Sequence, residues 1–295
     1  MFNIRYSIII FLTFVVISHD AVADKVIVID DSNLTVELTN TIQKIVSLSP
    51  HLTELTYEAG ADQYLVATVE YSDYPKAATK LPRVGSFKAW DMEKIISLKP
   101  DVVLVWLSGG NQRQIDQLYE LGLNVYISEP RQLSDISKTI RDIGKMAGTS
   151  MQAERNALAF DQGINKIKET FQHLSPVRLF YQVWGEPLIT INGQQLMSQV
   201  FHICGGVNIF SAIKTLAPVI TKEALLAENP DVIIGGARPE DQINWLDEWK
   251  RWSEMKAVKN NHLFYINPDL LNRQTTRMLQ GAEKVCDVLN QVRGN

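Results

Sequence analysis

Short apolar runs rich in β-branched residues alternate with helical patterns along the first half of the chain. The strand-like runs are at 44–49, 66–68, 102–106 and 125–128, and the helical patterns begin at Thr53 and cover 92–98 and 112–121. Such alternation is typical of parallel βα units, and continuously apolar strands suit a sheet that is covered on both faces. A more polar stretch before them, Val26 to Leu38, predicts a hairpin.

A different pattern follows from Ser150 to His173, where apolar residues recur every three or four positions. They are Ala153, Ala157, Phe160, Ile164, Ile167 and Phe171. This spacing predicts one helix of about 24 residues, with Ser150 as its N-cap and Ser175-Pro176 after its end. Strand-like sequence resumes at 177–183 and recurs at 263–266. The helix therefore lies between two regions that are each typical of an α/β lobe.

The two regions resemble each other. Residues 92–105 and 222–235 both show a helical pattern, a Pro-Asp pair, and an apolar strand. Glu93 and Glu223 each precede their Pro-Asp by seven positions, and a Gly-Gly pair follows or ends each strand. A helix, turn and strand unit is common enough for a chance match, but the order of the neighbouring elements also corresponds. We therefore expect two related lobes.

The first 23 residues have the pattern of a secretory signal. Arg5 supplies the positive charge, Tyr6–Ser18 is apolar, and Ala21-Val22-Ala23 fits a cleavage site. A membrane anchor is the alternative, but an apolar stretch of about a dozen residues is shorter than the roughly 20 that span a bilayer. No cysteine lies near the cut, which excludes a lipid anchor there. The expected division is a signal peptide at 1–23, an N-terminal lobe at 24–148, a linker helix at 149–175 and a C-terminal lobe at 176–295.

Charge and cysteine content limit the ligands and covalent links that the chain can have. A net charge of −4 gives no basic surface for nucleic acid. The chain has two cysteines, Cys204 and Cys286, and disulfides persist outside the cytosol. We expect them to form a bridge that stabilises the fold by roughly 4 kcal/mol, with two buried thiols as the alternative.

No catalytic constellation is present. The sequence lacks Gly-x-Ser-x-Gly, Gly-x-Gly-x-x-Gly and His-Glu-x-x-His, so neither a secreted enzyme nor a nucleotide-binding protein is favoured. The histidines show no metal-ligand spacing, which argues against a metal-ion binding protein. His51 is the one histidine directly after a strand, where α/β folds place ligands.

Aromatic residues gather after predicted strands and favour a binding cleft. They are Tyr71, Tyr74, Phe87, Trp90, Trp106 and Trp184. Ordinary packing is the alternative for each one. Trp245, Trp249 and Trp252 instead follow helical spacing, and we expect them to pack in the core.

Charged residues occupy two further kinds of position. Asp269 and Arg273 follow the last strand-like run and could bind a polar ligand, or they could form a surface ion pair at helical spacing. Glu93 and Glu223 lie in first helical turns after the possible caps Asp91 and Thr221, where a carboxylate favours the helix dipole.

Taken together, these segments resemble the BtuF-type periplasmic vitamin B12-binding proteins. The segments are Ser47-Leu-Ser-Pro-His-Leu-Thr-Glu-Leu55, Tyr71-Ser-Asp-Tyr-Pro75, Glu93, Leu98-Lys-Pro-Asp101, Trp106, Cys204-Gly-Gly206, Asn208-Ile-Phe210 and Cys286. The likeness covers about residues 42–292.

The resemblance implies a class III periplasmic binding protein, with two Rossmann-like lobes, one rigid helix and little hinge motion. It implies a periplasmic monomer that carries cobalamin to an ABC permease dimer in the inner membrane, without catalysis or a resident cofactor. Tyr71, Trp106 and the segment from Asp269 to Arg273 would contact the ligand. Glu93 and Glu223 would dock on the permease, and Cys204 would pair with Cys286.

Three positions depart from the resemblance. Phe87, Ala217 and Leu270 stand where the B12-binding proteins have tryptophan. The alternative ligands are therefore haem, a ferric siderophore, or a related corrinoid such as cobinamide.

Overall fold

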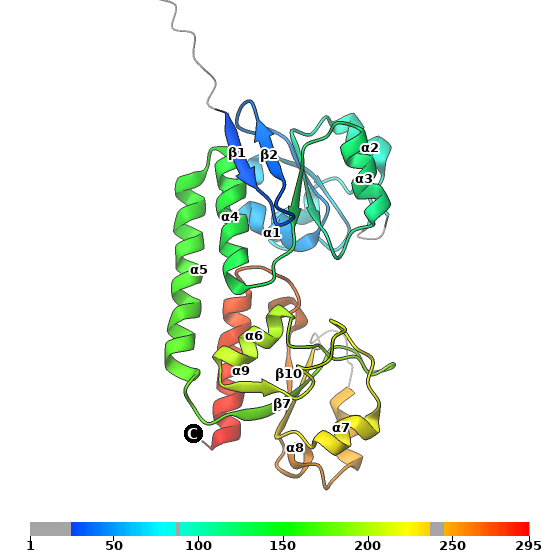
Figure 1. The fold of residues 1–295 in the computed structure, drawn as a ribbon, viewed down its shortest axis with the longest axis vertical. Coiled ribbons are helices and arrows are strands. Elements are labelled where there is room, and N and C mark those ends of the chain that lie inside the picture. Colours follow the sequence, from blue (N-terminus) through cyan, green and yellow to red (C-terminus); the bar gives the residue numbers. More distant parts are fainter. Residues whose placement is uncertain (1–24, 87–88, 237–244, 295) are drawn as a thin grey trace, which may run out of the picture.

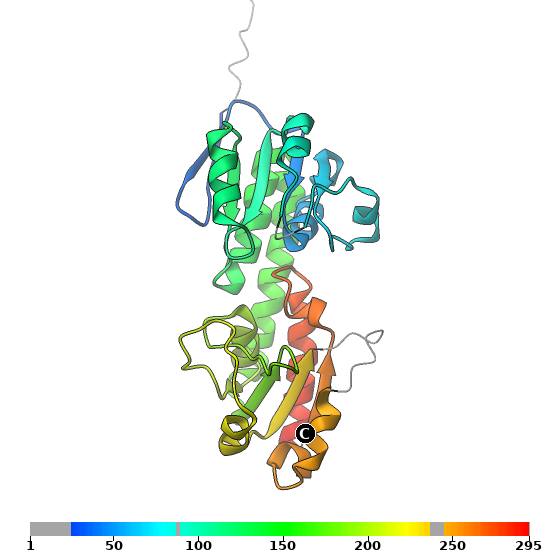
Figure 2. The same ribbon diagram turned by 90° about the vertical axis from the view of Figure 1, so that its right-hand side faces the viewer.

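Two α/β lobes lie end to end, and one long helix runs beside both of them (Figures 1 and 2). The computed structural model describes residues 25–86, 89–236 and 245–294. The expected signal peptide, residues 1–23, lies outside these described residues. No helix in the described part of the chain is both long and apolar enough to cross a membrane.

The N-terminal lobe contains a four-stranded parallel sheet in the order β4-β3-β5-β6, and a separate antiparallel pair, β1 and β2. Its strands are β1 (Val26–Ile29), β2 (Thr35–Leu38), β3 (Ile45–Ser47), β4 (Leu65–Thr68), β5 (Val102–Trp106) and β6 (Val125–Ser128). Its helices are α1 (Pro50–Glu58), α2 (Met92–Leu98), α3 (Gln112–Glu120) and α4 (Leu133–Ala147), with 3₁₀ turns at Asp62–Tyr64 and Lys76–Lys80. The hairpin and all the strands expected in this half are present.

The C-terminal lobe contains a second four-stranded parallel sheet, in the order β10-β9-β7-β8. Its strands are β7 (Val177–Gln182), β8 (Gly206–Asn208), β9 (Val232–Gly236) and β10 (Leu263–Ile266). Its helices are α6 (Leu196–Ile203), α7 (Lys222–Glu228), α8 (Lys256–Lys259) and α9 (Met278–Arg293), with 3₁₀ helices at Trp245–Arg251 and Pro268–Leu270. Trp249 lies on the first of these 3₁₀ helices, is buried and donates a hydrogen bond to Gln182, whereas Trp252 follows the end of that helix and is half-buried.

The two sheets have the same strand order. The strands β3, β4, β5 and β6 of the first sheet correspond to β7, β8, β9 and β10 of the second. With this matching, corresponding strands have corresponding neighbours in the two sheets. The helices α2 and α7 correspond too, since each has seven residues and ends at a left-handed residue, Lys99 or Asn229. The internal resemblance in the sequence therefore reflects two lobes of one design.

The repeated Pro-Asp pair has a structural role in both lobes. Asp101 accepts a hydrogen bond on its carboxylate from the backbone of Lys44 at 2.8 Å, just before β3. Asp231 accepts one from the backbone of Arg178 at 3.0 Å, in β7. Each aspartate therefore fixes the start of the strand that pairs with its own, because β5 pairs with β3 and β9 with β7.

The long helix α5 (Ser150–Phe171) connects the lobes at the position expected from the sequence. Its N-cap is Thr149 rather than Ser150, and the Thr149 hydroxyl donates instead to the carbonyl of Ala59 beyond α1. Figure 1 shows α4 beside the first part of α5 and α9 beside its last part. The helix therefore packs on both lobes instead of bridging open solvent.

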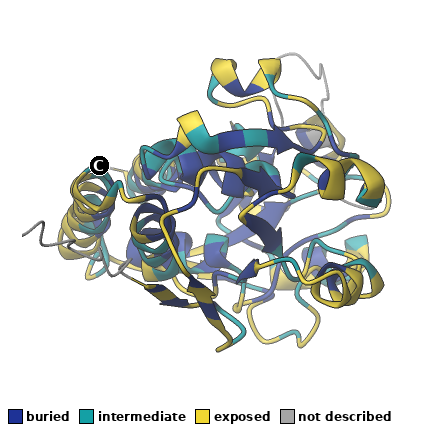
Figure 3. Ribbon diagram, turned by 90° about the horizontal axis from the view of Figure 1, so that it is seen from above, coloured by how far each residue is buried: buried dark blue, intermediate teal, exposed yellow. Residues whose placement is uncertain are grey.

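One hydrophobic cluster continues through α5 from lobe to lobe. It includes Tyr126 of the first sheet, Ala157 and Ile164 of α5, and Tyr181 of the second sheet, all buried. Separate clusters cover the opposite face of each sheet. Figure 3 shows this arrangement as buried strands surrounded by helices whose outer faces are exposed.

Two glycines allow α5 to approach its neighbours closely. A Cβ at Gly144 of α4 would lie 2.2 Å from the Cβ of Ala153, and a Cβ at Gly163 would lie 2.5 Å from a terminal methyl of Leu279 in α9. Both separations are far below van der Waals contact. A side chain at Gly144 is therefore excluded by the packing of α4 on α5, whereas one at Gly163 would require the end of the Leu279 side chain to shift.

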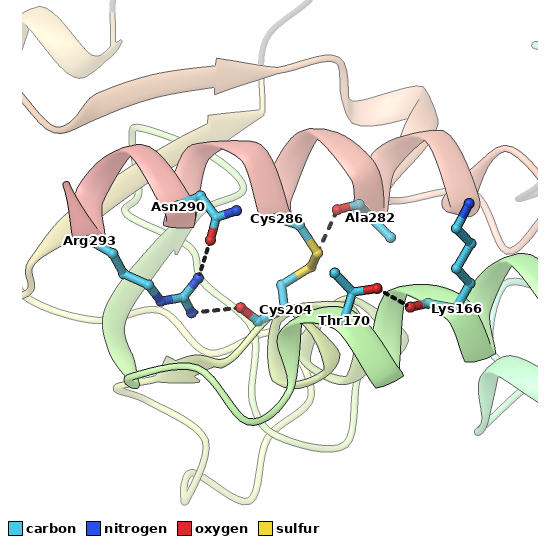
Figure 4. The surroundings of a disulfide bond; sticks show 7 residues. All are labelled: Lys166, Thr170, Cys204, Ala282, Cys286, Asn290 and Arg293. Atoms are coloured by element: carbon cyan, nitrogen blue, oxygen red, sulfur yellow. Dashed lines mark hydrogen bonds between the residues drawn. A yellow bond between two sulfur atoms is a disulfide. The ribbon is translucent and has the colours of Figure 1, made fainter. Parts of the chain in front are cut away.

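A disulfide joins Cys204, just after α6, to Cys286 in α9 (Figure 4). The expected bridge is therefore present and lies within the C-terminal lobe. Arg293 donates from Nη2 to the carbonyl of Cys204 at 2.8 Å and so adds a second link between the same segments.

Gly144→Ala tests the close approach of α4 and α5. Helix propensity alone predicts a gain of roughly 0.5–1 kcal/mol. We expect a loss of about 1–3 kcal/mol instead, because the Ala153 methyl cannot rotate away and the helices must separate. Urea unfolding of the two proteins measures the difference.

Gly163→Ala is the matched control. Its Cβ meets the flexible end of Leu279, so we expect a smaller loss than at Gly144. A Gly144→Ala protein more stable than the parent would contradict the packing argument.

Candidate binding site between the lobes

The carboxyl ends of the two sheets face each other. Glu54 lies in α1, directly after β3, and Asp73 follows β4, yet both contact Arg273, which follows β10 in the other lobe. In Figure 1 the loop before α9 extends from the C-terminal lobe towards α1. Parallel α/β folds place ligands at this end of their strands. The interlobe space is therefore the candidate site.

Ion pairs cross this space. Arg273 Nη1 donates to Glu54 Oε1 at 2.9 Å and to Asp73 Oδ1 at 2.7 Å. Its Nε lies 3.3 Å from Asp269 Oδ1, so the pair predicted at helical spacing also exists. Arg277 donates from Nη2 to Glu54 Oε1 at 2.7 Å and from Nε to Oε2 at 2.9 Å. One buried carboxylate of the N-terminal lobe thus binds two guanidinium groups of the C-terminal lobe.

The pKa values of neighbouring groups reflect this environment. Burial lowers the pKa of Arg273, but the hydrogen bonds that it donates to Asp73 and Glu54 and the negative charge of Asp269 outweigh that effect and raise it. Burial, together with the negative charge of Glu54, raises the pKa of Glu58 in the next turn of α1. Arg273 is therefore held firmly as a cation in an acidic surrounding.

Tyr71 projects outward because the residue after it is anchored. The buried Ser72 hydroxyl accepts from Thr68 at 2.7 Å, and the Ser72 carbonyl accepts from Arg83 at 3.0 Å. Tyr71 has a left-handed backbone with φ of 63° and an exposed fraction of 65%. A tyrosine in that conformation costs of order 1 kcal/mol, and such strain concentrates at functional sites.

Trp106 ends β5 and packs against two neighbours at the carboxyl end of the sheet. Its ring lies edge-on to His51, with ring centroids 5.4 Å apart, and a Cβ at Gly109 would lie 2.0 Å from Trp106 Cε3. His51 Nδ1 is 2.7 Å from the Ser49 hydroxyl, and its buried Nε2 has no hydrogen-bond partner. Burial and the charge of Arg273 lower the pKa of His51 to about 3, so the ring is neutral.

Trp184 follows β7 and supplies an aromatic ring from the C-terminal lobe. It is 50% exposed and donates from Nε1 to the carbonyl of Glu186 at 2.9 Å. Among the described residues, no group of three His, Cys, Asp or Glu side chains could hold a metal ion. The site therefore consists of aromatic rings and of charged groups that already pair with one another.

A family model for periplasmic binding proteins matches residues 45–270. The chain belongs to the periplasmic binding protein family. Its two lobes and single connecting helix are those of class III.

Named relatives span both lobes. The vitamin B12-binding proteins of Vibrio cholerae serotype O1 and Vibrio vulnificus are 36% and 34% identical over 248 and 247 residues, which is 84% and 83% of this chain and 89% of each relative. The crystal structure of the periplasmic vitamin B12 binding protein BtuF of Vibrio cholerae matches with a TM-score of 0.80 at 34% identity, over 86% of this chain and 99% of that one. The periplasmic heme-binding protein RhuT from Roseiflexus sp. RS-1 has a TM-score of 0.75 at 18% identity, over 85% of this chain and 98% of that one, and so shares the fold.

One expected aromatic contact of this periplasmic binding protein, Trp90, lies elsewhere. Trp90 is only 6% exposed and belongs to the hydrophobic cluster on the outer face of the first sheet, so little of its ring could meet a ligand. It is buried because the backbone of residue 90 bridges Gly85 and holds a hydrogen bond with Gln114. Phe87 lies outside the described residues.

The hollows that the structure shows at the lobe junction are lined by other residues. One of about 580 Å³ lies along α4, α5 and α6, and includes Arg141 and His202. One of about 510 Å³ lies between Arg131 and Gln194. None of the described side chains expected to bind ligand lines either of these two hollows.

Glu93 and Glu223 occupy equivalent exposed positions. Each is in the first turn of its helix, where the caps Asp91 and Thr221 accept backbone hydrogen bonds as expected. Figure 1 places α2 and α7 on the side of the molecule away from α5, one on each lobe. Within the described part of the chain, neither carboxylate has an ion-pair partner.

Sequence analysis did not single out Glu54, Asp73 or Arg277. Glu54 lies among the apolar residues of α1, and a carboxylate on a buried helix face is a usable signal because it needs a partner. Arg277 is four residues after Arg273, and both lie in the segment between the 3₁₀ helix Pro268–Leu270 and α9. What the sequence could not show is that these residues of different lobes meet.

Gly109→Ala tests how Trp106 is held. We expect a loss of about 1–3 kcal/mol in stability, because the indole or its loop must move to admit the methyl group. Urea unfolding measures the loss, and near-ultraviolet circular dichroism reports on the displaced indole.

The same substitution in a Trp106→Leu background is the control. We expect the loss to shrink there, since the ring atoms that meet the new Cβ are gone. An equal loss in both backgrounds would show that the loop backbone, rather than the ring, excludes a side chain at position 109.

Proposed function

We propose that this periplasmic binding protein captures cobalamin between its lobes and delivers it to an ABC permease. The observation that carries the proposal is the match of both lobes and the connecting helix to vitamin B12-binding proteins, at 34% identity and a TM-score of 0.80 for the solved structure. Because the likeness includes both sides of the interlobe space, it supports the ligand class as well as the fold.

The side chains at the strand ends suit a corrinoid. A corrinoid has a broad apolar macrocycle bordered by polar amides, and binding sites of this kind combine aromatic surface with a few placed polar groups. Tyr71, Trp106 and Trp184 offer the rings, and Arg273 and Asp269 offer a donor and an acceptor. These five residues form the proposed ligand surface.

Haem and ferric siderophores are less favoured. The heme-binding structures that match this chain are 18–21% identical and share only the fold. Cobinamide shares the corrin ring and stays within the proposed ligand class. We also propose that the protein acts as a periplasmic monomer without catalysis, after removal of residues 1–23.

Calorimetric titration with cyanocobalamin tests the ligand. We expect one molecule to bind per chain with a dissociation constant below about 10 μM, or about −7 kcal/mol. Tyr71→Ala should weaken binding at least tenfold, because a hot-spot aromatic contributes roughly 2 kcal/mol.

Tyr119→Ala is the matched control, since Tyr119 is an exposed tyrosine on α3 outside the proposed ligand surface. Its affinity should equal that of the parent protein. The cobalamin proposal would be overturned if no binding were detected at cyanocobalamin concentrations of roughly tens of micromolar, which exceed the expected dissociation constant.

Glu93 and Glu223 are proposed as the docking pair for the permease. Equivalent exposed carboxylates, one on each lobe, suit two basic pockets on a dimeric partner, and such charges act mainly on recognition and association rate. Neither residue belongs to the proposed ligand surface, so docking and ligand binding can be tested separately.

The double variant Glu93→Ala, Glu223→Ala should weaken association with the cognate permease in nanodiscs and leave cyanocobalamin affinity unchanged. Surface plasmon resonance measures the first and calorimetry the second. The control is Glu169→Ala with Glu283→Ala, which removes the same charge from exposed positions on α5 and α9. A loss of ligand affinity in the first double variant would place its residues in the site instead.

A further inference from the structure

The two arginines that reach Glu54 do not bind it in the same way. Arg277 uses Nε and Nη2 on the two oxygens of that one carboxylate, at 2.9 and 2.7 Å. Its guanidinium also lies 4.1 Å from the centre of the Tyr74 ring. Arg273 instead divides Nη1 between Glu54 and Asp73. Arg277 therefore has the complete bidentate geometry on Glu54, whereas Arg273 reaches Glu54 through Nη1 alone and uses Nε on Asp269 and Nη2 on the carbonyl of Tyr71, both at 3.3 Å.

We propose that Arg277 is the fixed counter-charge of Glu54, and that it leaves Arg273 free to exchange its carboxylate partners for polar groups of the ligand. This inference rests on the proposed function, in which Arg273 contacts the bound corrinoid. It assigns Arg277 and Glu54 a positioning role, since neither needs to touch the ligand.

Burial explains why two arginines are needed. The Glu54 side chain is 2% exposed, and a buried carboxylate without a partner is strongly unfavourable. If Arg273 were its only partner, any movement of Arg273 to the ligand would leave that charge unpaired. With Arg277 in place, Glu54 keeps a donor on each oxygen after Arg273 departs.

The other partners of Arg273 can lose it at little cost. Asp73 is 48% exposed, and Asp269 lies on the same segment as Arg273 itself. The exposed Asp73 carboxylate recovers water when its ion pair breaks, so that contact is weak. The charged groups that face the cluster are Glu54 and Glu58 of α1, Asp73, Asp269 and the two arginines. Four carboxylates thus surround two guanidinium groups, which keeps Arg273 charged wherever it points.

A released Arg273 suits acceptor-rich ligand groups. Guanidinium presents five N–H donors in a planar fork and no acceptor. Amide carbonyls and a phosphate diester fit that donor set, and cobalamin carries both. Cobinamide carries the amides without the nucleotide phosphate, so the two probes separate the groups that Arg273 meets.

Arg277→Met, Glu54→Gln and their combination test the proposal by calorimetry with cyanocobalamin. Arg277→Met keeps the aliphatic length but makes Arg273 the only cation for Glu54, so we expect about tenfold weaker binding. Adding Glu54→Gln removes the charge that retains Arg273, and affinity should return to within about threefold of the parent. Binding stoichiometry near one in each protein shows that all molecules are folded.

Two further variants sharpen the comparison. Arg178→Met breaks the exposed Arg178–Glu228 pair of the C-terminal lobe and should not change affinity. Arg277→Lys keeps the charge without the bidentate fork, should lose less affinity than Arg277→Met, and serves in its place if that protein does not fold.

The outcomes separate the inference from the proposed function. A parent protein that fails to bind cyanocobalamin overturns both. In the other case the parent protein binds, Arg277→Met weakens binding, and adding Glu54→Gln deepens that loss or leaves it unchanged. Arg277 is then merely structural, and the inference alone is overturned. Rescue of affinity by Glu54→Gln is the expected result.

Discussion

The packing of α5 against both lobes sets the geometry of the whole molecule. Buried residues along this helix, from Ala153 to Ile167, belong to one hydrophobic cluster that includes both sheets. To separate the lobes by a large hinge movement would expose part of that cluster to water, at about 25 cal/mol for each Å² of apolar surface. The strand ends that face each other are consequently kept at a nearly constant separation.

Because the lobes are held by this packing, changes on ligand binding are expected in the side chains between them. The lobes meet through Glu54, Asp73, Arg273 and Arg277, whose contacts are ionic and can be exchanged one at a time. Hydrophobic contacts lose energy in proportion to area, whereas an arginine that changes partner keeps most of its hydrogen bonds. A site of this kind can admit a large ligand by rearranging a few polar contacts while α4, α5 and α9 remain packed.

The sequence predicted the fold well because each element depended on local pattern. The β-branched runs at 102–106 and 125–128 and the helix at 92–98 have the bounds that were expected, and the linker helix ends only two residues early. The site was harder, because its contacts join residues up to 223 positions apart. Trp90 follows the same strand-end rule as Trp106 yet is buried, since the bridge at Gly85 turns it to the outer face of the sheet. Glu54 and Arg277 could not be paired without knowing that α1 meets the loop before α9.

Leu270 and Ala217 are two positions at which the resemblance to B12-binding proteins implied tryptophan. Leu270 is buried, and the adjacent backbone is so close to α9 that a Cβ at Gly281 would lie 2.4 Å from the carbonyl oxygen of Leu270. An indole at 270 would need that segment to move, and Ala217 offers a methyl group alone. Among the described residues, the exposed aromatic surface at the strand ends comes from Tyr71 and Tyr74 in one lobe and from Trp184 in the other. A flat ligand has two faces, and one large exposed ring on each lobe is the least that would cover both.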